Sequence, residues 1–228
     1  MSSCKSDFST LISNGPLVVG AVADLGILMT DPASFRDSCD LIELRLDSLG
    51  AGAEVVKFAK ACPLPLLVTS RGKAEGGAGS WSCAERAAQY RALLSIATVI
   101  DIELSQFDAL KEVRAEAEVA KVPIVGSFHD FEKTPELEEL RRLRKEAGLF
   151  FKAATFVREQ RDLQILYDFL KSEDRSSVMG MGPMGGSARP SMAAMGSILN
   201  YGYLGEFATA PGQWRAGDLR KAITASQI

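Results

Sequence analysis

Short apolar runs rich in β-branched residues recur along the whole chain, and segments with helical periodicity separate them. Buried runs of this length are typical of parallel strands covered by helices on the outer face. Eight such runs predict an α/β fold, a (β/α)8 TIM barrel, forming a single domain over residues 1–228. The runs are Leu17–Ala23, Leu41–Leu46, Pro65–Ser70, Val99–Leu104, Val122–Phe128, Phe150–Phe156, Val178–Gly182 and Tyr203–Ala208.

The segments between the runs carry recognisable helix ends. Ser82 precedes Glu85 by three residues, which is a capping-box pattern. Thr134 followed by Pro135 predicts an N-cap and a first helical turn, and Gly148 marks the end of that helix. These signals favour a helix after most of the predicted strands.

An open, doubly wound sheet is the main structural alternative. Such a sheet usually has a Gly-x-Gly-x-x-Gly turn after its first strand, but Ala21-Val22-Ala23-Asp24 stands there instead. The glycine-rich segments Gly72–Gly79 and Gly180–Gly186 each follow a predicted strand directly, so we interpret them as strand-to-helix loops. The pattern therefore favours the closed barrel.

Composition excludes several classes of protein. The net charge is -3 and no long basic tract occurs, so we expect no binding of nucleic acid. No apolar stretch is long enough to span a bilayer, and the start of the chain, with Lys5 and Asp7, lacks the apolar run of a secretory signal. The cysteines Cys4, Cys39, Cys62 and Cys83 form no C-x-x-C pair. We therefore expect a cytoplasmic protein with reduced thiols, no membrane contact and no metal site.

Ionisable residues occur inside or just after five consecutive predicted strands. In a barrel these positions converge on the carboxyl ends of the strands, where active sites form. Glu43 and Arg45 are two residues apart and so project to the same side of their strand, as do Asp101 and Glu103. An ion pair that ties strands together is the better interpretation of Asp101 alone, but the whole set predicts a polar basin. Its other members are Arg71 with Glu75, His129, and Lys152.

Lys152 lies among Phe150, Phe151, Ala153 and Ala154. A lysine in such a run either extends to solvent or is held inside, where burial and nearby cations lower its pKa. A neutral amine can attack a carbonyl to form a Schiff base. His129 is the single histidine of the sequence and ends the preceding predicted strand. Imidazole suits proton transfer near neutral pH, so this pair predicts chemistry beside a carbonyl carbon.

The ordered motifs of the sequence resemble those of type I 3-dehydroquinate dehydratases, also called 3-dehydroquinases. The resemblance extends from the second predicted strand to the eighth, and its most specific parts are the Ser-x-His-Asp-Phe and Ala-Pro-Gly-Gln segments. The matching motifs are Glu43-Leu44-Arg45, Thr69-Ser70-Arg71 with Glu75-Gly76-Gly77, Ser127-Phe128-His129-Asp130-Phe131, Lys152, Met179-Gly180-Met181-Gly182, Arg189, Met195-Gly196-Ser197 and Ala210-Pro211-Gly212-Gln213.

The resemblance implies a reaction without metal or organic cofactor. Lys152 forms an imine with the C3 ketone of 3-dehydroquinate, and the imine makes the C2 proton more acidic. His129 removes that proton and then protonates the departing C1 hydroxyl, which gives 3-dehydroshikimate after hydrolysis of the imine. Glu75 completes the catalytic set by orienting His129. The small-molecule substrate is the expected partner. The resemblance also implies a homodimer, because members of the family are often homodimers.

The resemblance further implies which residues bind the substrate. Arg189 matches the position that recognises its carboxylate, and a guanidinium suits that anion. The other matching positions hold the ring and its hydroxyls: Glu43, Arg45, Arg71, Met179, Met181, Tyr201, Thr209, Ala210 and Gln213. Some positions depart from the family pattern, with Ala188 for serine, Met195 and Tyr201 for phenylalanine, and Thr209 for serine. The loop from Gly182 to Pro190 is expected to close over bound substrate.

Two other functions stay open. A class I aldolase is also a Schiff-base barrel, and Gly180–Gly186 could bind a substrate phosphate, although its methionines suit that role poorly. A catalytically silent barrel that only binds a ligand is the second alternative. Borohydride reduction in the presence of a ketone separates the silent barrel from both enzymes, because it traps an imine irreversibly.

Overall fold

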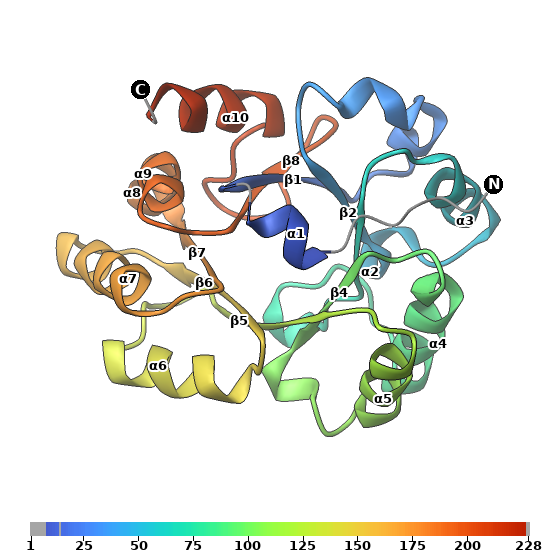
Figure 1. Ribbon diagram of the computed structural model, residues 1–228, viewed down its shortest axis with the longest axis horizontal. Coiled ribbons are helices and arrows are strands. Elements are labelled where there is room, and N and C mark those ends of the chain that lie inside the picture. The colour runs from blue at the N-terminus through green and yellow to red at the C-terminus, as the bar shows by residue number, and fades with distance from the viewer. Residues whose placement is uncertain (1–7, 14, 227–228) are drawn as a thin grey trace.

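The computed structural model describes residues 8–13 and 15–226; Cys4, Lys5 and Asp7 lie outside the described residues. Eight parallel strands form a barrel whose helices lie around its outside (Figure 1). Each strand pairs with its sequence neighbour from β1 to β7, and β8 pairs with β1. The predicted (β/α)8 fold is confirmed. The strands are β1 Leu17–Val22, β2 Leu41–Arg45, β3 Leu66–Thr69, β4 Val99–Glu103, β5 Ile124–Asp130, β6 Phe150–Phe156, β7 Ser176–Met181 and β8 Leu199–Tyr203.

The helices vary widely in length. Short 3-10 helices occur at η1 Leu25–Met29, η2 Pro32–Phe35, η3 Lys73–Glu75 and η4 Leu104–Gln106. The α-helices are α1 Phe8–Ile12, α2 Leu46–Leu49, α3 Ala53–Ala61, α4 Cys83–Leu94, α5 Lys111–Val119, α6 Leu137–Glu146, α7 Gln160–Ser172, α8 Gly182–Ser187, α9 Arg189–Ala194 and α10 Ala216–Ala225. None of the described helices is both long and apolar enough to cross a membrane.

The barrel closes between β7 and β8 through serine side chains. The hydroxyl of Ser197 accepts a hydrogen bond from the backbone N–H of Val178, and that of Ser177 accepts one from Leu199, both at 3.0 Å. One backbone bond, from Ile198 N–H to the Ser176 carbonyl, adds to them at 3.0 Å. These contacts satisfy strand groups that would otherwise be left unpaired where the two strands meet.

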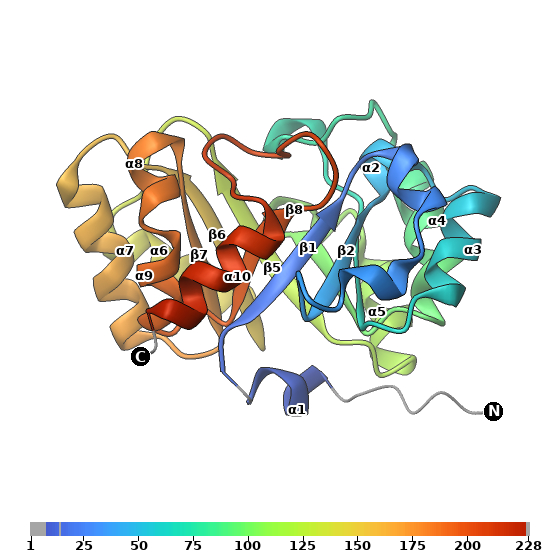
Figure 2. The same cartoon turned by 90° about the horizontal axis from the view of Figure 1, so that it is seen from above.

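Apolar side chains fill the end of the barrel at which the strands begin. Val19, Leu41, Leu67, Val99 and Val125 are buried there from successive strands. Helix α1 lies across this end, opposite the loops that join strands to helices (Figure 2). Its Phe8 packs edge-on against Phe150, with ring centroids 4.9 Å apart. The polar residues are therefore left to the other end, where the strands finish.

Three expectations about element ends need correction. The eighth strand was expected at Tyr203–Ala208, but it is Leu199–Tyr203, and the chain turns away after Leu204 donates a hydrogen bond to the Ala21 carbonyl at 2.9 Å. The segment from Gly182 to Pro190 is helical rather than a loop, since it forms α8 and begins α9. The helix expected to be capped by Thr134 starts at Leu137, with Glu136 as its N-cap.

Other helix ends were predicted correctly. The capping box of Ser82 and Glu85 is present at the start of α4, with both reciprocal contacts formed. Gly148 follows the end of α6 and has a φ of 80°, a left-handed conformation that glycine adopts without strain. The Thr134 hydroxyl bonds the Phe156 carbonyl instead of a helix N–H, which explains why it does not cap α6.

Candidate active site

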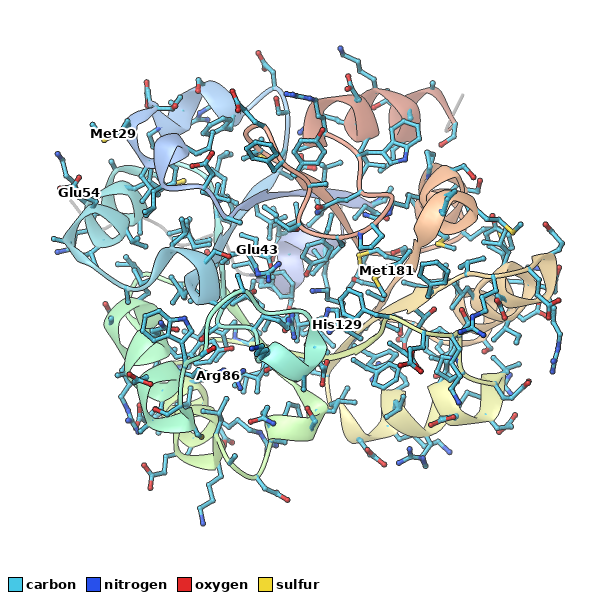
Figure 3. All side chains as sticks on the ribbon, turned by 180° about the vertical axis from the view of Figure 1, so that it is seen from behind. Met29, Glu43, Glu54, Arg86, His129 and Met181 are labelled. Carbon is cyan, nitrogen blue, oxygen red and sulfur yellow. The ribbon has the colours of Figure 1, made fainter. Side chains whose placement is uncertain are left out.

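A cavity opens at the carboxyl ends of the strands, and every site residue predicted from the sequence lines it. Glu43, His129 and Met181 lie around the centre of the barrel, whereas Met29 and Glu54 lie at its edge (Figure 3). The predicted residues brought together are Glu43, Arg45, Arg71, Glu75, His129, Lys152, Met179, Met181, Arg189, Tyr201, Thr209, Ala210 and Gln213. Gly76, Phe131 and Ala154 complete the lining.

Lys152 stands on β6 with its amine inside the barrel. Its side chain is 6% exposed, and Nζ lies 3.0 Å from Oδ2 of Asp101. Burial lowers the pKa of Lys152; Asp101 opposes this shift and Arg71 adds to it. The amine therefore loses its proton more easily than an exposed lysine does, which corresponds to the buried one of the two alternatives that the sequence left open.

Asp101, on β4, is the counterion of two cations. Arg71 Nη2 and the Ser127 hydroxyl both donate to its Oδ1, at 2.7 and 2.6 Å. Although burial alone raises the pKa of Asp101, Arg71 and Lys152 hold it at about 2. The interpretation of Asp101 as an ion-pair residue is confirmed, but its partner Lys152 makes it part of the site. The sequence could place Asp101 on the inner face of its strand without showing which cation it meets.

His129 is the last residue but one of β5, which pairs with the strand of Lys152, and Ser127 of β5 is in register with Lys152. Its Nδ1 lies 2.9 Å from Oε2 of Glu75, and the same oxygen accepts the backbone N–H of His129 at 3.0 Å. Burial, with a contribution from Arg71, lowers the pKa of His129 well below its usual value. The imidazole is therefore neutral at pH 7, and a proton held on Nδ1 leaves the lone pair on Nε2.

Glu75 comes from η3, in the glycine-rich loop after β3. Ser105 donates to its other oxygen, Oε1, at 2.7 Å. Burial raises the pKa of Glu75. The loop itself is held by Asp47, whose carboxylate accepts the backbone N–H of Arg71 at 3.2 Å and that of Ala78 at 3.0 Å. Asp47 thus fixes both ends of the loop that presents Glu75, a role that the sequence did not reveal.

Arg189, the first residue of α9, is a further buried cation that lines the cavity. It is 4% exposed, and its guanidinium donates to the backbone carbonyls of Tyr201 at 2.8 Å and Gly180 at 3.3 Å. Burial lowers the pKa of Arg189 to about 10, so it stays charged at neutral pH. No ion pair to it occurs among the described residues, and a buried charge without a counterion favours binding of an anion.

The remaining predicted residues shape the cavity. Arg45 forms a bidentate contact with Asp47, at 2.9 and 2.8 Å, and the Thr69 hydroxyl donates to Glu43 at 2.7 Å. Thr209 donates to Gln213 Oε1 from both its N–H and its hydroxyl, at 2.7 and 2.8 Å. Within the described residues, no group of three or more histidine, cysteine or acidic side chains could hold a metal ion.

Comparison with known proteins gives a consistent result. A family model described as type I 3-dehydroquinase matches residues 22–228. A 3-dehydroquinate dehydratase of Methanococcus maripaludis is 37% identical over an alignment of 192 residues that covers 81% of this chain and 87% of the relative. One from Thermodesulfovibrio yellowstonii is 30% identical over an alignment of 221 residues that covers 92% of this chain and 95% of the relative. The crystal structure of 3-dehydroquinate dehydratase from Geobacillus kaustophilus superposes with a TM-score of 0.81 at 23% identity, covering 93% of this chain and 91% of that chain.

Proposed function

The chain belongs to the type I 3-dehydroquinase family, and we propose that it dehydrates 3-dehydroquinate to 3-dehydroshikimate in the shikimate pathway through an imine on Lys152. One observation carries the mechanism: a buried amine with a lowered pKa and a neutral imidazole line the same cavity from adjacent strands. A cavity with these two groups can activate a carbonyl and move a proton on the neighbouring carbon.

Lys152 acts as the nucleophile of this proposal. Its neutral amine attacks C3 of the substrate, and loss of water gives an imine that becomes cationic when it is protonated. Asp101, which lies 3.0 Å from Nζ in the free protein, is placed to stabilise that cation. The cationic imine withdraws electrons from C2, so the C2 proton becomes acidic enough for a histidine to remove.

His129 acts as base and then as acid. Nε2 carries the free lone pair when Nδ1 donates to Glu75, so Nε2 takes the C2 proton. The resulting imidazolium is stabilised by Glu75 and gives a proton to the leaving C1 hydroxyl. Water then hydrolyses the imine and releases the enone product. The imine itself is the electron sink, so we propose that no metal or organic cofactor takes part.

Substrate binding follows from the charges around the cavity. Arg189 has no acidic partner among the described side chains, and its guanidinium donates hydrogen bonds to the substrate carboxylate. Glu43, Arg45 and Arg71 face the ring hydroxyls from β2 and the end of β3, and Met179 and Met181 pack against its apolar face. Thr209, Ala210, Tyr201 and Gln213 complete the enclosure from β8 and the following loop.

Two further expectations belong to the same proposal. We propose a homodimer, because members of the family often form homodimers, and a cytoplasmic location, because Cys39, Cys62 and Cys83 are free thiols, as is usual in a reducing compartment. Light scattering coupled to size exclusion tests the oligomeric state, and a mass equal to one chain rejects the dimer. Fractionation of cells that express the protein tests the compartment.

Growth of ultraviolet absorbance from the conjugated enone, in purified protein mixed with 3-dehydroquinate, tests the proposed reaction. Lys152→Ala is the matched control, and phosphorylated ketoses are offered separately to test the aldolase alternative. We expect the native protein to form the enone from 3-dehydroquinate, and we expect Lys152→Ala to form none. A folded native protein that leaves 3-dehydroquinate unchanged contradicts the proposal, and cleavage of a phosphorylated ketose favours the aldolase.

A further inference from the structure

Tyr201 carries a hydroxyl that has no hydrogen-bond partner, although it is buried in the site. It is one of two such atoms among the described side chains, and the other, on Arg220, lies outside the active-site cavity. Burying an unpaired hydroxyl costs free energy, so such a group usually gains a partner in some functional state.

The ring of Tyr201 lies directly beside the proposed nucleophile. Lys152 Nζ stands 4.2 Å from the ring centroid, over its face. Tyr201 is 4% exposed and belongs to the apolar cluster inside the barrel, together with Met179 and Met181. The ring of Tyr201 is therefore packed beside the atom that forms and breaks the bond to C3 in the proposed reaction.

The groups around the Tyr201 hydroxyl keep it protonated, so that it can donate a hydrogen bond. Burial raises its pKa well above the usual value, and the carboxylates of Asp101 and Glu43 add to the shift. Both carboxylates already accept hydrogen bonds, Asp101 from Arg71, Ser127 and Lys152, and Glu43 from Thr69. The phenol thus remains protonated and has a hydrogen bond left to donate.

We propose that the Tyr201 hydroxyl donates this hydrogen bond to the oxygen on C3 during formation and hydrolysis of the imine. When the Lys152 amine adds to the ketone, the C–N bond forms and the ketone oxygen becomes the carbinolamine hydroxyl. That hydroxyl leaves as water when the neutral imine forms, with both protons of the water coming from the Lys152 amine, and a water oxygen returns to C3 when the imine is hydrolysed. No proton is transferred by Tyr201 itself.

The inference rests on the proposed function, because it needs an imine on Lys152. It adds a residue for the oxygen at C3, which is distinct from the C2 and C1 steps assigned to His129. The phenol beside Nζ then finds its acceptor in the oxygen that shares C3 with the new C–N bond.

Tyr201→Phe isolates the hydroxyl, since the ring and its contact with Lys152 remain. Tyr203→Phe is the matched control, because Tyr203 lies two residues along the same strand and does not line the cavity. Two rates are compared: turnover of 3-dehydroquinate, and loss of ¹⁸O from the C3 ketone of 3-dehydroshikimate into water. The second rate reports carbinolamine and imine steps without dehydration, and Lys152→Ala supplies the background exchange.

We expect Tyr201→Phe to slow both rates about 3- to 10-fold, the range for one hydrogen bond lost from a transition state. Its melting temperature should equal or exceed that of the native protein, because the unpaired buried hydroxyl is gone. Tyr203→Phe should match the native protein in both rates. Unchanged ¹⁸O loss in Tyr201→Phe overturns the inference, whether or not turnover falls. Native protein with neither activity instead overturns the proposed function.

Discussion

Glu75 and His129 are joined by two hydrogen bonds to a single carboxylate oxygen. Oε2 accepts from the ring Nδ1 at 2.9 Å and from the backbone N–H at 3.0 Å. The bond to Nδ1 favours the His129 tautomer that carries its proton on Nδ1. The bond from the backbone N–H fixes the position of the Glu75 carboxylate relative to β5. A histidine at the end of β5 is thereby oriented by a residue from the loop after β3, which is 54 positions away in the sequence.

Glu75→Gln tests this orientation. The amide can present its NH₂ group to Nδ1, which favours the wrong tautomer and leaves Nε2 protonated. We expect kcat to fall about 100-fold, within the range that a positioned acid–base group contributes. The assay is enone formation at saturating substrate. Ser105→Ala, which removes the 2.7 Å contact to the other carboxylate oxygen, is the control and should have a smaller effect. Equal losses in the two variants contradict the tautomer argument.

The reactivity of Lys152 should depend on Asp101. Because burial lowers the pKa of Lys152, arylation of its amine should reach half its maximal rate below the pH of 10.5 that is ordinary for lysine. Asp101 raises that pKa, so Asp101→Asn should move the midpoint to still lower pH. Labelling with an aryl fluoride, followed by peptide mass spectrometry over a pH series, gives both midpoints. A midpoint that rises in Asp101→Asn rejects this assignment.

Asp101 should also make the protein sensitive to acid. Its pKa falls from 3.8 in the unfolded chain to about 2 in the folded protein, so its carboxylate binds protons less readily when folded. The resulting stabilisation, on the order of 2 kcal/mol, is present above about pH 4 and is lost as the pH falls toward 2. Urea unfolding between pH 5 and pH 2 measures it, on top of the contributions of other carboxylates.

The control for this acid effect is Asp101→Asn, which has no charge to lose. It should be less stable at neutral pH by about 3–5 kcal/mol, because Arg71 is left buried beside a neutral group. Its free energy of unfolding should then decrease less than that of the native protein over the same pH range. Parallel curves for the two proteins are incompatible with the role given to Asp101.

Arg189 should matter for binding more than for turnover. Arg189→Met removes the buried cation that we assign to the substrate carboxylate, so KM should rise about 100-fold, the equivalent of one charge-assisted contact. Arg189→Lys keeps the charge but not the fork of donors, and should give an intermediate KM. Steady-state kinetics measure both. A KM unchanged in Arg189→Met, with kcat reduced, places the carboxylate elsewhere.

The sequence predicted the site better than the boundaries of its elements. Alternation of apolar and ionisable residues is a local property, and it correctly placed Glu43 and Arg45 on the same face of their strand, whereas for Lys152 the sequence left open whether the amine is buried or exposed. The partners that fix these groups depend on distant residues. Asp101 meets a lysine 51 positions away, and Asp47 bonds a loop 24 to 31 positions away, so neither contact has a local signal.

The corrected elements have a physical explanation in close packing. A Cβ on Gly202 would lie 2.5 Å from the Ala216 Cα, so this glycine lets α10 approach β8 rather than ending the strand. A Cβ on Gly185 would lie 2.5 Å from the Gly180 backbone, so glycine there lets α8 pack on β7. Gly180–Gly186 was interpreted as a strand-to-helix loop because it directly follows a predicted strand, whereas its glycines remove steric bulk where α8 packs on β7.

Reduction with sodium borohydride in the presence of 3-dehydroshikimate tests the central claim, an imine on Lys152, most directly. The account predicts irreversible loss of activity, with one reduced ligand attached to the peptide that contains Lys152. Lys152→Ala should gain no such adduct under the same conditions. Two results would contradict the account. In the first, the native protein keeps its activity and gains no adduct after borohydride treatment with the ligand. In the second, the adduct is on a different lysine.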